Sequence, residues 1–188
     1  MTESRIAIFG GTFDPVHLGH LHIAAVARDA MALDEVRFVP CRISPHKSGM
    51  PPASAQHRAA MLKAATHDFP WAVVDERELQ REEPSFSWQT AESFRAEFPD
   101  ARLFWLMGAD QWDALPRWTH PEKLAACVEF IVFPRAGITP QARPGYVLHT
   151  LVGVHPASAT GIRNADGTAG GWLPPDVAAW IETHGLYR

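Results

Sequence analysis

The chain is poor in cysteine, in net charge and in long apolar runs, and each shortage excludes a class of protein. Its two cysteines, Cys41 and Cys127, lie far apart without metal-ligand spacing, so neither a disulfide framework nor a zinc site is expected. The net charge is −4 and the 17 lysines and arginines are scattered, which argues against binding to nucleic acid. No run approaches the roughly 18 apolar residues of a membrane span, and the first residues lack a signal-peptide pattern. We therefore expect a cytoplasmic protein with free thiols and no membrane or nucleic-acid partner.

The sequence does contain enough apolar residues for one buried core. Apolar residue types make up 46% of the 188 residues and charged types 20%, which is ordinary for a globular domain. No internal repeat, low-complexity tract or linker divides the chain. A single domain over residues 1–188 is therefore the expected organisation.

Short β-branched and aromatic runs alternate along the chain with stretches of helical spacing. Strands are predicted over residues 5–9, 35–40, 71–75, 102–108, 128–134 and 146–152, and helices over residues 19–33, 54–69, 87–98 and 174–185. The connection between the first two strands is long enough for a right-handed crossover, which makes them parallel. The pattern favours a Rossmann-like α/β fold, a doubly wound open parallel sheet with helices on both faces. Ligands of such sheets bind beyond the carboxyl ends of the strands.

The stretch GGTFDPVHLGH (10–20) joins the first predicted strand to the first predicted helix. Gly10 and Gly11 let backbone N–H groups approach an anion, and the start of the helix adds its positive end. His17 and His20, three residues apart, can bring two imidazole N–H groups to one phosphoryl oxygen. Nucleotidyl transfer requires such fixed donors, because negative charge spreads over the phosphoryl oxygens in its transition state.

The same stretch also fits a purely structural role. A glycine pair after a strand is common in turns, and two histidines at this spacing can simply cap a helix. A metal site formed by His17, His20 and His22 is disfavoured, since no carboxylate pair accompanies them at ligand spacing. Asp14 is expected to hold the Asp-Pro turn through a local hydrogen bond. From spacing alone, phosphate chemistry and helix capping remain equally open.

Several blocks along the chain resemble a known family. GTFDPVHLGH is similar to the HxGH signature of the nucleotidyltransferase superfamily of adenylyl- and cytidylyltransferases. Further blocks resemble bacterial nicotinate-nucleotide adenylyltransferases in order and spacing: SPHK (44–47), HRAAML (57–62), DERELQREEPSFSWQT (75–90), FWLMGADQWDALPRW (104–118), SATGIR (158–163) and the closing GLYR. The resemblance implies transfer of AMP from ATP to nicotinate mononucleotide in NAD biosynthesis, giving deamido-NAD and pyrophosphate, with Mg²⁺ accompanying ATP.

The resemblance also implies an ATP site with three catalytic candidates, His17, His20 and Arg163. The full set implied for ATP is Gly10, Gly11, Thr12, Phe13, His17, His20, Gly108, Asp110, Ser158, Thr160 and Arg163. Asp110 is expected to accept a hydrogen bond from a ribose hydroxyl, and Arg163 to offset charge as pyrophosphate leaves. Taken alone, Ser158 and Thr160 fit ordinary helix caps equally well.

A second set, implied for the mononucleotide, comprises Lys47, Phe86, Ser87 and Trp118. Trp118 is expected to stack on the pyridine ring. Phe86 stands where the family has a tyrosine and Ser87 where it has a threonine, so one hydroxyl is lost and one is kept. Lys47, with His46, is expected near the mononucleotide phosphate, although a solvated loop lysine fits as well.

Other features depart from the family or belong to the packing. Gly161 stands where relatives have a larger residue, which is expected to weaken that helix start and loosen its loop. Trp88, Trp105 and Trp112 are assigned to packing. Two other functions stay open: an HxGH-type transferase acting on nicotinamide mononucleotide, phosphopantetheine or a lipid headgroup, and a non-catalytic nucleotide-binding module. The sequence leaves open both the acid or amide preference and whether the chain forms a homo-oligomer.

Overall fold

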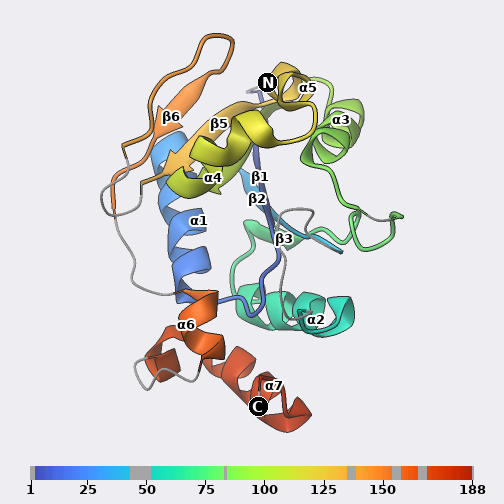
Figure 1. Ribbon diagram of the computed structural model, residues 1–188, viewed down its shortest axis with the longest axis vertical. Coiled ribbons are helices and arrows are strands. Elements are labelled where there is room, and N and C mark those ends of the chain that lie inside the picture. The colour runs from blue at the N-terminus through green and yellow to red at the C-terminus, as the bar shows by residue number, and fades with distance from the viewer. Residues whose placement is uncertain are drawn as a thin grey trace.

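A parallel β-sheet in the strand order β3-β2-β1-β4-β5-β6 organises the chain (Figure 1). The computed structural model describes residues 3–42, 52–82, 84–134, 139–153, 158–164 and 169–187. Its strands are β1 (Arg5–Gly11), β2 (Glu35–Pro40), β3 (Ala72–Val74), β4 (Arg102–Gly108), β5 (Glu129–Phe133) and β6 (Leu148–Thr150). The chain leaves β1 toward β3 and then returns to the other side of β1 at β4, so the strand order reverses between β1 and β4. The predicted doubly wound fold is confirmed.

Helices cover both faces of this sheet. They are α1 (Leu18–Met31), α2 (Ala55–Thr66), α3 (Ser87–Glu97), α4 (Ala109–Ala114), α5 (Pro121–Cys127), α6 (Ala159–Arg163) and α7 (Pro175–His184), with short 3₁₀ turns η1 (Leu115–Arg117) and η2 (Ala169–Trp172). One apolar layer contains the buried side chains of α1, α2 and α7, and the other contains those of α3, α4 and α5. Among the described residues, no helix combines the length and the apolarity that crossing a bilayer requires.

The central strands are apolar on both sides because both of their faces are covered. In β1, Ala7 and Phe9 enter one layer, whereas Ile6 and Ile8 enter the other. Residues along a strand alternate between the two sides of a sheet, so a single apolar run can supply both layers. Burial of a side chain such as Phe9 or Ile8 contributes roughly 2 kcal/mol to the stability of the fold.

The helix ends follow local sequence signals. Ser54 caps α2 by accepting a hydrogen bond from the N–H of His57 at 3.3 Å, and α2 ends at Thr66 rather than at the predicted residue 69. Gly185 ends α7 in the left-handed conformation that glycine adopts without strain, as its position predicted. The short helix α5 was not predicted, because Leu124 is its single buried residue and one residue gives no periodic pattern.

Candidate active site at the carboxyl edge of the sheet

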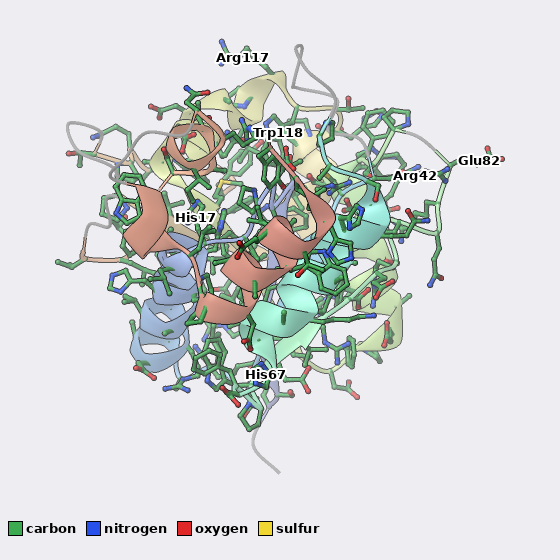
Figure 2. The ribbon with its side chains drawn as sticks, turned by 90° about the horizontal axis from the view of Figure 1, so that it is seen from below. His17, Arg42, His67, Glu82, Arg117 and Trp118 are labelled. Carbon is green, nitrogen blue, oxygen red and sulfur yellow. The ribbon has the colours of Figure 1, made fainter. Side chains whose placement is uncertain are left out.

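The predicted site residues follow the carboxyl ends of adjacent strands. In β1 and β2, Gly11 pairs with Pro40, and in β4 and β5, Gly108 pairs with Phe133, so the loops after these strands leave from one edge. Figure 2 views the molecule from this side, and His17 lies well inside the outline of the molecule there. By contrast, Glu82 projects from the rim in the same view. This edge includes the reversal between β1 and β4, where sheets of this type bind ligands.

Gly10 and Gly11 do not form a turn after the first strand, as the sequence predicted, but are the last two residues of β1, where they are tightly packed. A Cβ atom at Gly11 would lie 3.0 Å from the ring of Phe13, and one at Gly10 would lie 3.1 Å from the ring of Trp105. Phe13 has a positive φ of 49°, and its ring is 2% exposed and packs against Phe9. The ring of Phe13 therefore belongs to the core, so contact between this residue and ATP would come from its main chain.

The two histidines of the loop form a stacked pair at the start of α1. Their ring centroids lie 3.7 Å apart with an interplanar angle of 27°, and His17 is 6% exposed. The backbone N–H of His17 donates to Nδ1 of His20 at 3.2 Å, so His20 does cap the helix through one ring nitrogen. Because Nδ1 acts as an acceptor, the neutral ring of His20 carries its proton on Nε2. Capping and phosphate binding are therefore compatible, since they use different nitrogens of one ring.

Arg163 reaches back from α6 to the same loop. Its Nη1 donates to the main-chain oxygen of Asp14 at 2.5 Å and lies 3.7 Å from the Oδ2 of that residue. The prediction of a local turn bond for Asp14 is wrong. Its Oδ1 instead accepts hydrogen bonds from the Ala53 N–H at 3.0 Å and the Tyr187 hydroxyl at 2.6 Å. The structure thus brings the catalytic candidate Arg163 to the loop that carries His17.

Ser158 and Gly161 together form the start of α6. The Ser158 hydroxyl accepts a hydrogen bond from the N–H of Gly161 at 3.1 Å, so the helix-cap interpretation of this serine is confirmed. Thr160 accepts a hydrogen bond from Nη2 of Arg163 at 3.4 Å. A Cβ atom at Gly161 would lie 3.1 Å from the Ser158 hydroxyl and 3.3 Å from the ring of Trp172. A side chain at Gly161 would therefore crowd both the cap and Trp172.

The end of β4 presents an acidic side chain. Asp110 is exposed in the first turn of α4, and its carboxylate folds back over the strand end. A Cβ atom at Gly108 would lie only 2.7 Å from Oδ1 of Asp110, a distance that real side chains do not tolerate. The absence of a side chain at Gly108 therefore allows the Asp110 carboxylate to take this position, next to the turn after β1.

Three of the residues implied for the mononucleotide, Phe86, Ser87 and Trp118, belong to or follow elements on the sheet face that is covered by α3, α4 and α5. Phe86 is the N-cap of α3 and Ser87 its first residue, while Trp118 follows η1 and is half-buried against the layer formed by α3, α4 and α5. Lys47 and His46 lie outside the described residues.

Two of the three tryptophans assigned to packing are fully buried. Trp105 is 3% exposed and Trp112 is 0% exposed, which confirms their assignment. Trp88 is half-buried, with the Lys123 ammonium 4.4 Å from its ring centroid.

Sequence reasoning missed Arg58 in the block HRAAML. Its guanidinium is 1% exposed and donates to the carbonyl oxygens of Thr12 at 2.8 Å, Cys41 at 2.8 Å, Arg42 at 3.0 Å and Ala53 at 2.9 Å. These carbonyls belong to the loops after β1 and β2 and to the segment before α2. The sequence did contain a signal for Arg58. It lies three residues before Met61 and four before Leu62, and at this helical spacing it shares their buried face of α2. Arg58 holds together three segments around the site.

A second polar network holds the segment before α3. Glu78, 4% exposed, accepts a hydrogen bond from the Thr90 hydroxyl at 2.6 Å, and Thr90 in turn accepts one from Arg81 at 3.0 Å. Burial raises the pKa of Glu78 above its ordinary value, although Thr90 and Arg81 oppose the shift. Arg42, after β2, donates its N–H to the Ser85 hydroxyl at 3.3 Å. This network fixes the start of α3 relative to the loop after β2.

The paired imidazoles and Arg163 meet at the loop after β1, at the switch point of an α/β sheet, and residues 8–165 match the model of the Cytidylyltransferase-like family. A probable nicotinate-nucleotide adenylyltransferase of Aeromonas hydrophila is 38% identical over 214 residues, covering 100% of this chain and 99% of that protein. One of Neisseria meningitidis is 36% identical over 198 residues, covering 98% of each. The chain therefore belongs to the nicotinate-nucleotide adenylyltransferase family, and it is an enzyme of the nucleotidyltransferase class.

Solved structures agree with this fold. A nicotinic acid mononucleotide adenylyltransferase of Plasmodium falciparum, complexed with NaAD, superposes with a TM-score of 0.83 at 19% identity and 98% coverage of both chains. A putative nicotinate-nucleotide adenylyltransferase of Vibrio parahaemolyticus gives a TM-score of 0.69 at 20% identity. At these identities the likeness shows the fold alone.

Proposed function

We propose that the protein transfers the adenylyl group of ATP to nicotinate mononucleotide, giving deamido-NAD and pyrophosphate. The observation that carries this proposal is the His17–His20 pair at the start of α1, in the loop that follows the two glycines at the end of β1. The pair, the first amides of α1 and the Arg163 guanidinium make the loop after β1 a cluster of donors with positive character. Such a cluster suits a triphosphate better than any neutral or cationic ligand.

The reaction on this site is an in-line displacement. A 5′-phosphate oxygen of the mononucleotide attacks the α-phosphorus of ATP, the bond to the bridging oxygen breaks, and pyrophosphate leaves. The N–H at Nε2 of His20 donates to an α-phosphoryl oxygen, where negative charge grows in the transition state. Arg163 binds the phosphates that leave. No covalent enzyme intermediate is needed, because the protein supplies alignment and fixed donors.

The remaining site residues orient the two nucleosides. Asp110 binds a ribose hydroxyl of ATP, and Trp118 stacks on the pyridine ring of the acceptor. The first turn of α3 and the Ser87 hydroxyl supply donors for the pyridine carboxylate, which the positive end of a helix favours over a carboxamide. Lys47 is assigned to the mononucleotide phosphate.

Magnesium fits this site as an ion bound to the nucleotide. The donor groups around the loop after β1 are imidazoles, amides and a guanidinium, which bind anions rather than hard cations. Within the described ranges, no group of three or more His, Cys, Asp or Glu side chains could hold an ion. Mg²⁺ would therefore be held by phosphate oxygens and water, and when bound it neutralises charge on the triphosphate.

Initial rates with two acceptors test the proposal. The purified protein is given ATP with nicotinate mononucleotide or nicotinamide mononucleotide at equal concentration, and pyrophosphate release is measured. We expect pyrophosphate and deamido-NAD with the acid, and a slower rate with the amide. Faster turnover of the amide would contradict the acceptor assignment. If the protein bound ATP but released no pyrophosphate in the presence of either acceptor, or of phosphopantetheine, the proposed function would be contradicted.

A further inference from the structure

Buried Asp14 connects the loop after β1 to two segments from the far end of the chain. Its side chain is 6% exposed, and its Oδ1 accepts a hydrogen bond from the hydroxyl of Tyr187, which lies 173 residues away in the sequence. Its main-chain oxygen accepts one from Nη1 of Arg163, which also lies 3.7 Å from Oδ2. Figure 1 shows α6 and α7 together beyond the carboxyl end of the sheet, where these contacts form.

Arg163 depends on these contacts for its orientation. It is the last residue of α6, a helix of five residues that includes no buried side chain. Its side chain is 32% exposed, and apart from Asp14 its guanidinium contacts the hydroxyl of Thr160, at the longer distance of 3.4 Å. The hydrogen bond and the charge of Asp14 therefore direct the guanidinium toward the loop after β1. An arginine that must meet phosphate oxygens benefits from being oriented before the ligand arrives.

The hydroxyl of Tyr187 in turn orients the carboxylate of Asp14. It donates to Oδ1 at 2.6 Å, beside the N–H of Ala53 at 3.0 Å, so two donors hold one oxygen and leave the other on the side of Arg163. Burial, with the hydrogen bond to Asp14 and its negative charge, raises the pKa of Tyr187, so the hydroxyl stays protonated and donates throughout the working pH range. A neutral donor holds the carboxylate without cancelling the charge that Arg163 meets.

We propose that Tyr187 is a positioning residue for ATP: through Asp14 it orients Arg163 toward the triphosphate. The inference rests on the proposed function, which identifies the phosphate ligand as ATP. Its own claim is that Tyr187 and Arg163 are coupled. A tyrosine that only anchored the end of the chain would affect stability and leave ATP affinity unchanged.

The substitution Tyr187→Phe removes the hydroxyl and keeps the ring. We expect KM for ATP to rise about three- to tenfold, the size of effect that one ordinary hydrogen bond has, while KM for nicotinate mononucleotide stays the same. The matched control is Tyr146→Phe, at the only other tyrosine of the chain, whose ring packs on Trp112 on the other sheet face. We expect both kinetic constants of this control to equal those of the wild type. A Tyr187→Phe variant with an unchanged KM for ATP, whatever its Tm, would overturn the proposal.

A double-mutant cycle identifies the route of the effect. If Tyr187 acts through Arg163, the Tyr187→Phe substitution has no further effect on ATP affinity in an Arg163→Ala background. Equal effects in the two backgrounds would overturn the proposal. Asp14→Asn provides a second variant, because it keeps an oxygen for Tyr187 and Ala53 and removes the charge that Arg163 faces. Asp14→Asn is expected to raise KM for ATP, as Tyr187→Phe does. An unchanged KM for ATP would contradict the claim that Tyr187 acts through Asp14.

Calorimetry with ATP separates this inference from the proposed function. Without an acceptor, the Tyr187→Phe variant is expected to bind ATP more weakly than the wild type. In the Arg163→Ala background, the same substitution is expected to leave ATP affinity unchanged. If the wild type bound ATP but made no deamido-NAD, the proposed function would fail while the coupling could still be measured. If deamido-NAD formed normally and the coupling were absent, only the inference about Tyr187 would fail.

Discussion

The proton on Nε2 of His20 is the central feature at the scale of single residues. The N–H of His17 donates to Nδ1 of His20, which fixes the tautomer, and the stacked rings hold the imidazole at the start of α1. A side chain can stabilise a transition state only where it already points at the developing charge, because reorganisation during the reaction costs free energy. His20 caps the helix through Nδ1, and we propose that the same ring is the catalytic donor through Nε2.

Two substitutions of His20 separate these functions. His20→Ala removes both nitrogens and is expected to lower kcat by about a hundredfold or more and to lower stability by about 1 kcal/mol. His20→Asn keeps an acceptor near the position of Nδ1, so kcat should fall to a similar extent while the free energy of unfolding stays near that of the wild type. Steady-state kinetics and urea denaturation measure the two effects. Wild-type turnover in either variant would exclude His20 as the donor.

We propose that Trp118 contributes affinity for the acceptor. Its ring is half-buried after η1, and stacking on a pyridine ring is worth about 1 kcal/mol, so Trp118→Ala should raise KM for nicotinate mononucleotide about fivefold. KM for ATP should not change. Trp71→Ala is the matched control, because Trp71 precedes β3 at the opposite edge of the sheet and should affect stability alone. An unchanged KM for the mononucleotide in Trp118→Ala would remove this residue from the site.

At the scale of elements, the site is held by the buried face of α2. The Arg58 guanidinium donates to four carbonyl oxygens in the segments after β1, after β2 and before α2. Loop carbonyls without partners would make these segments costly to bury, since a buried acceptor without a donor costs roughly 1–3 kcal/mol. A helix that packs on the sheet therefore also determines the shape of the loops that we propose bind substrate.

Replacement of Arg58 by lysine tests this role. Lysine keeps the positive charge but lacks the planar fork, so it cannot reach carbonyls in several directions at once. We expect the free energy of unfolding to fall by roughly 2–4 kcal/mol, as measured by urea denaturation. The control, Arg28→Lys on α1, alters a partly exposed arginine that pairs with Asp29 and lies 4.9 Å from the ring centroid of Trp71, and it should lower stability by about 1 kcal/mol or less. Equal stabilities of the two variants would contradict the role of Arg58.

The sequence predicted those elements whose signal is local. Strands β1, β2 and β4 agree with the prediction to within two residues, because each is an apolar run covered on both faces. Strand β6 is shorter than predicted, since it lies at the sheet edge and extends over Leu148–Thr150 only. The partners of Asp14 and Arg58 were not predictable, because they lie far away in the sequence and carry no periodic pattern. The HxGH loop could be recognised because its residues are consecutive.

At the scale of the whole molecule, the acid stability of the fold depends on carboxyl groups outside the site. Glu129, at the start of β5, accepts hydrogen bonds from Arg102 at 2.6 Å and 2.8 Å and contacts His149 at 2.6 Å. The hydrogen bonds from Arg102 lower the pKa of Glu129, against the effect of burial. Glu78 has the opposite shift, because its burial raises the pKa. The two groups therefore act on stability with opposite sign as the pH falls.

The substitution Glu129→Gln tests how this carboxyl group contributes to stability as the pH falls. A carboxyl whose folded pKa lies below its unfolded value of about 4.3 stabilises the fold above that value, and the contribution is lost as pH falls through the folded pKa. The variant should therefore be less stable than the wild type at pH 7, and the difference should shrink in urea titrations carried from pH 5 toward pH 3. Activity at pH 7 should be unchanged, because β5 begins at the amino edge of the sheet. A stability difference independent of pH would contradict the assignment.

Transfer of a labelled phosphate tests the central claim most directly. The protein is incubated with nicotinate mononucleotide and ATP that carries ³²P at the α-phosphorus, and the products are separated by chromatography. We predict that the label appears in deamido-NAD at the rate at which unlabelled pyrophosphate is released, and that the His20→Asn variant slows both together. Label that remains in ATP, or that leaves as AMP without reaching the acceptor, would contradict the account.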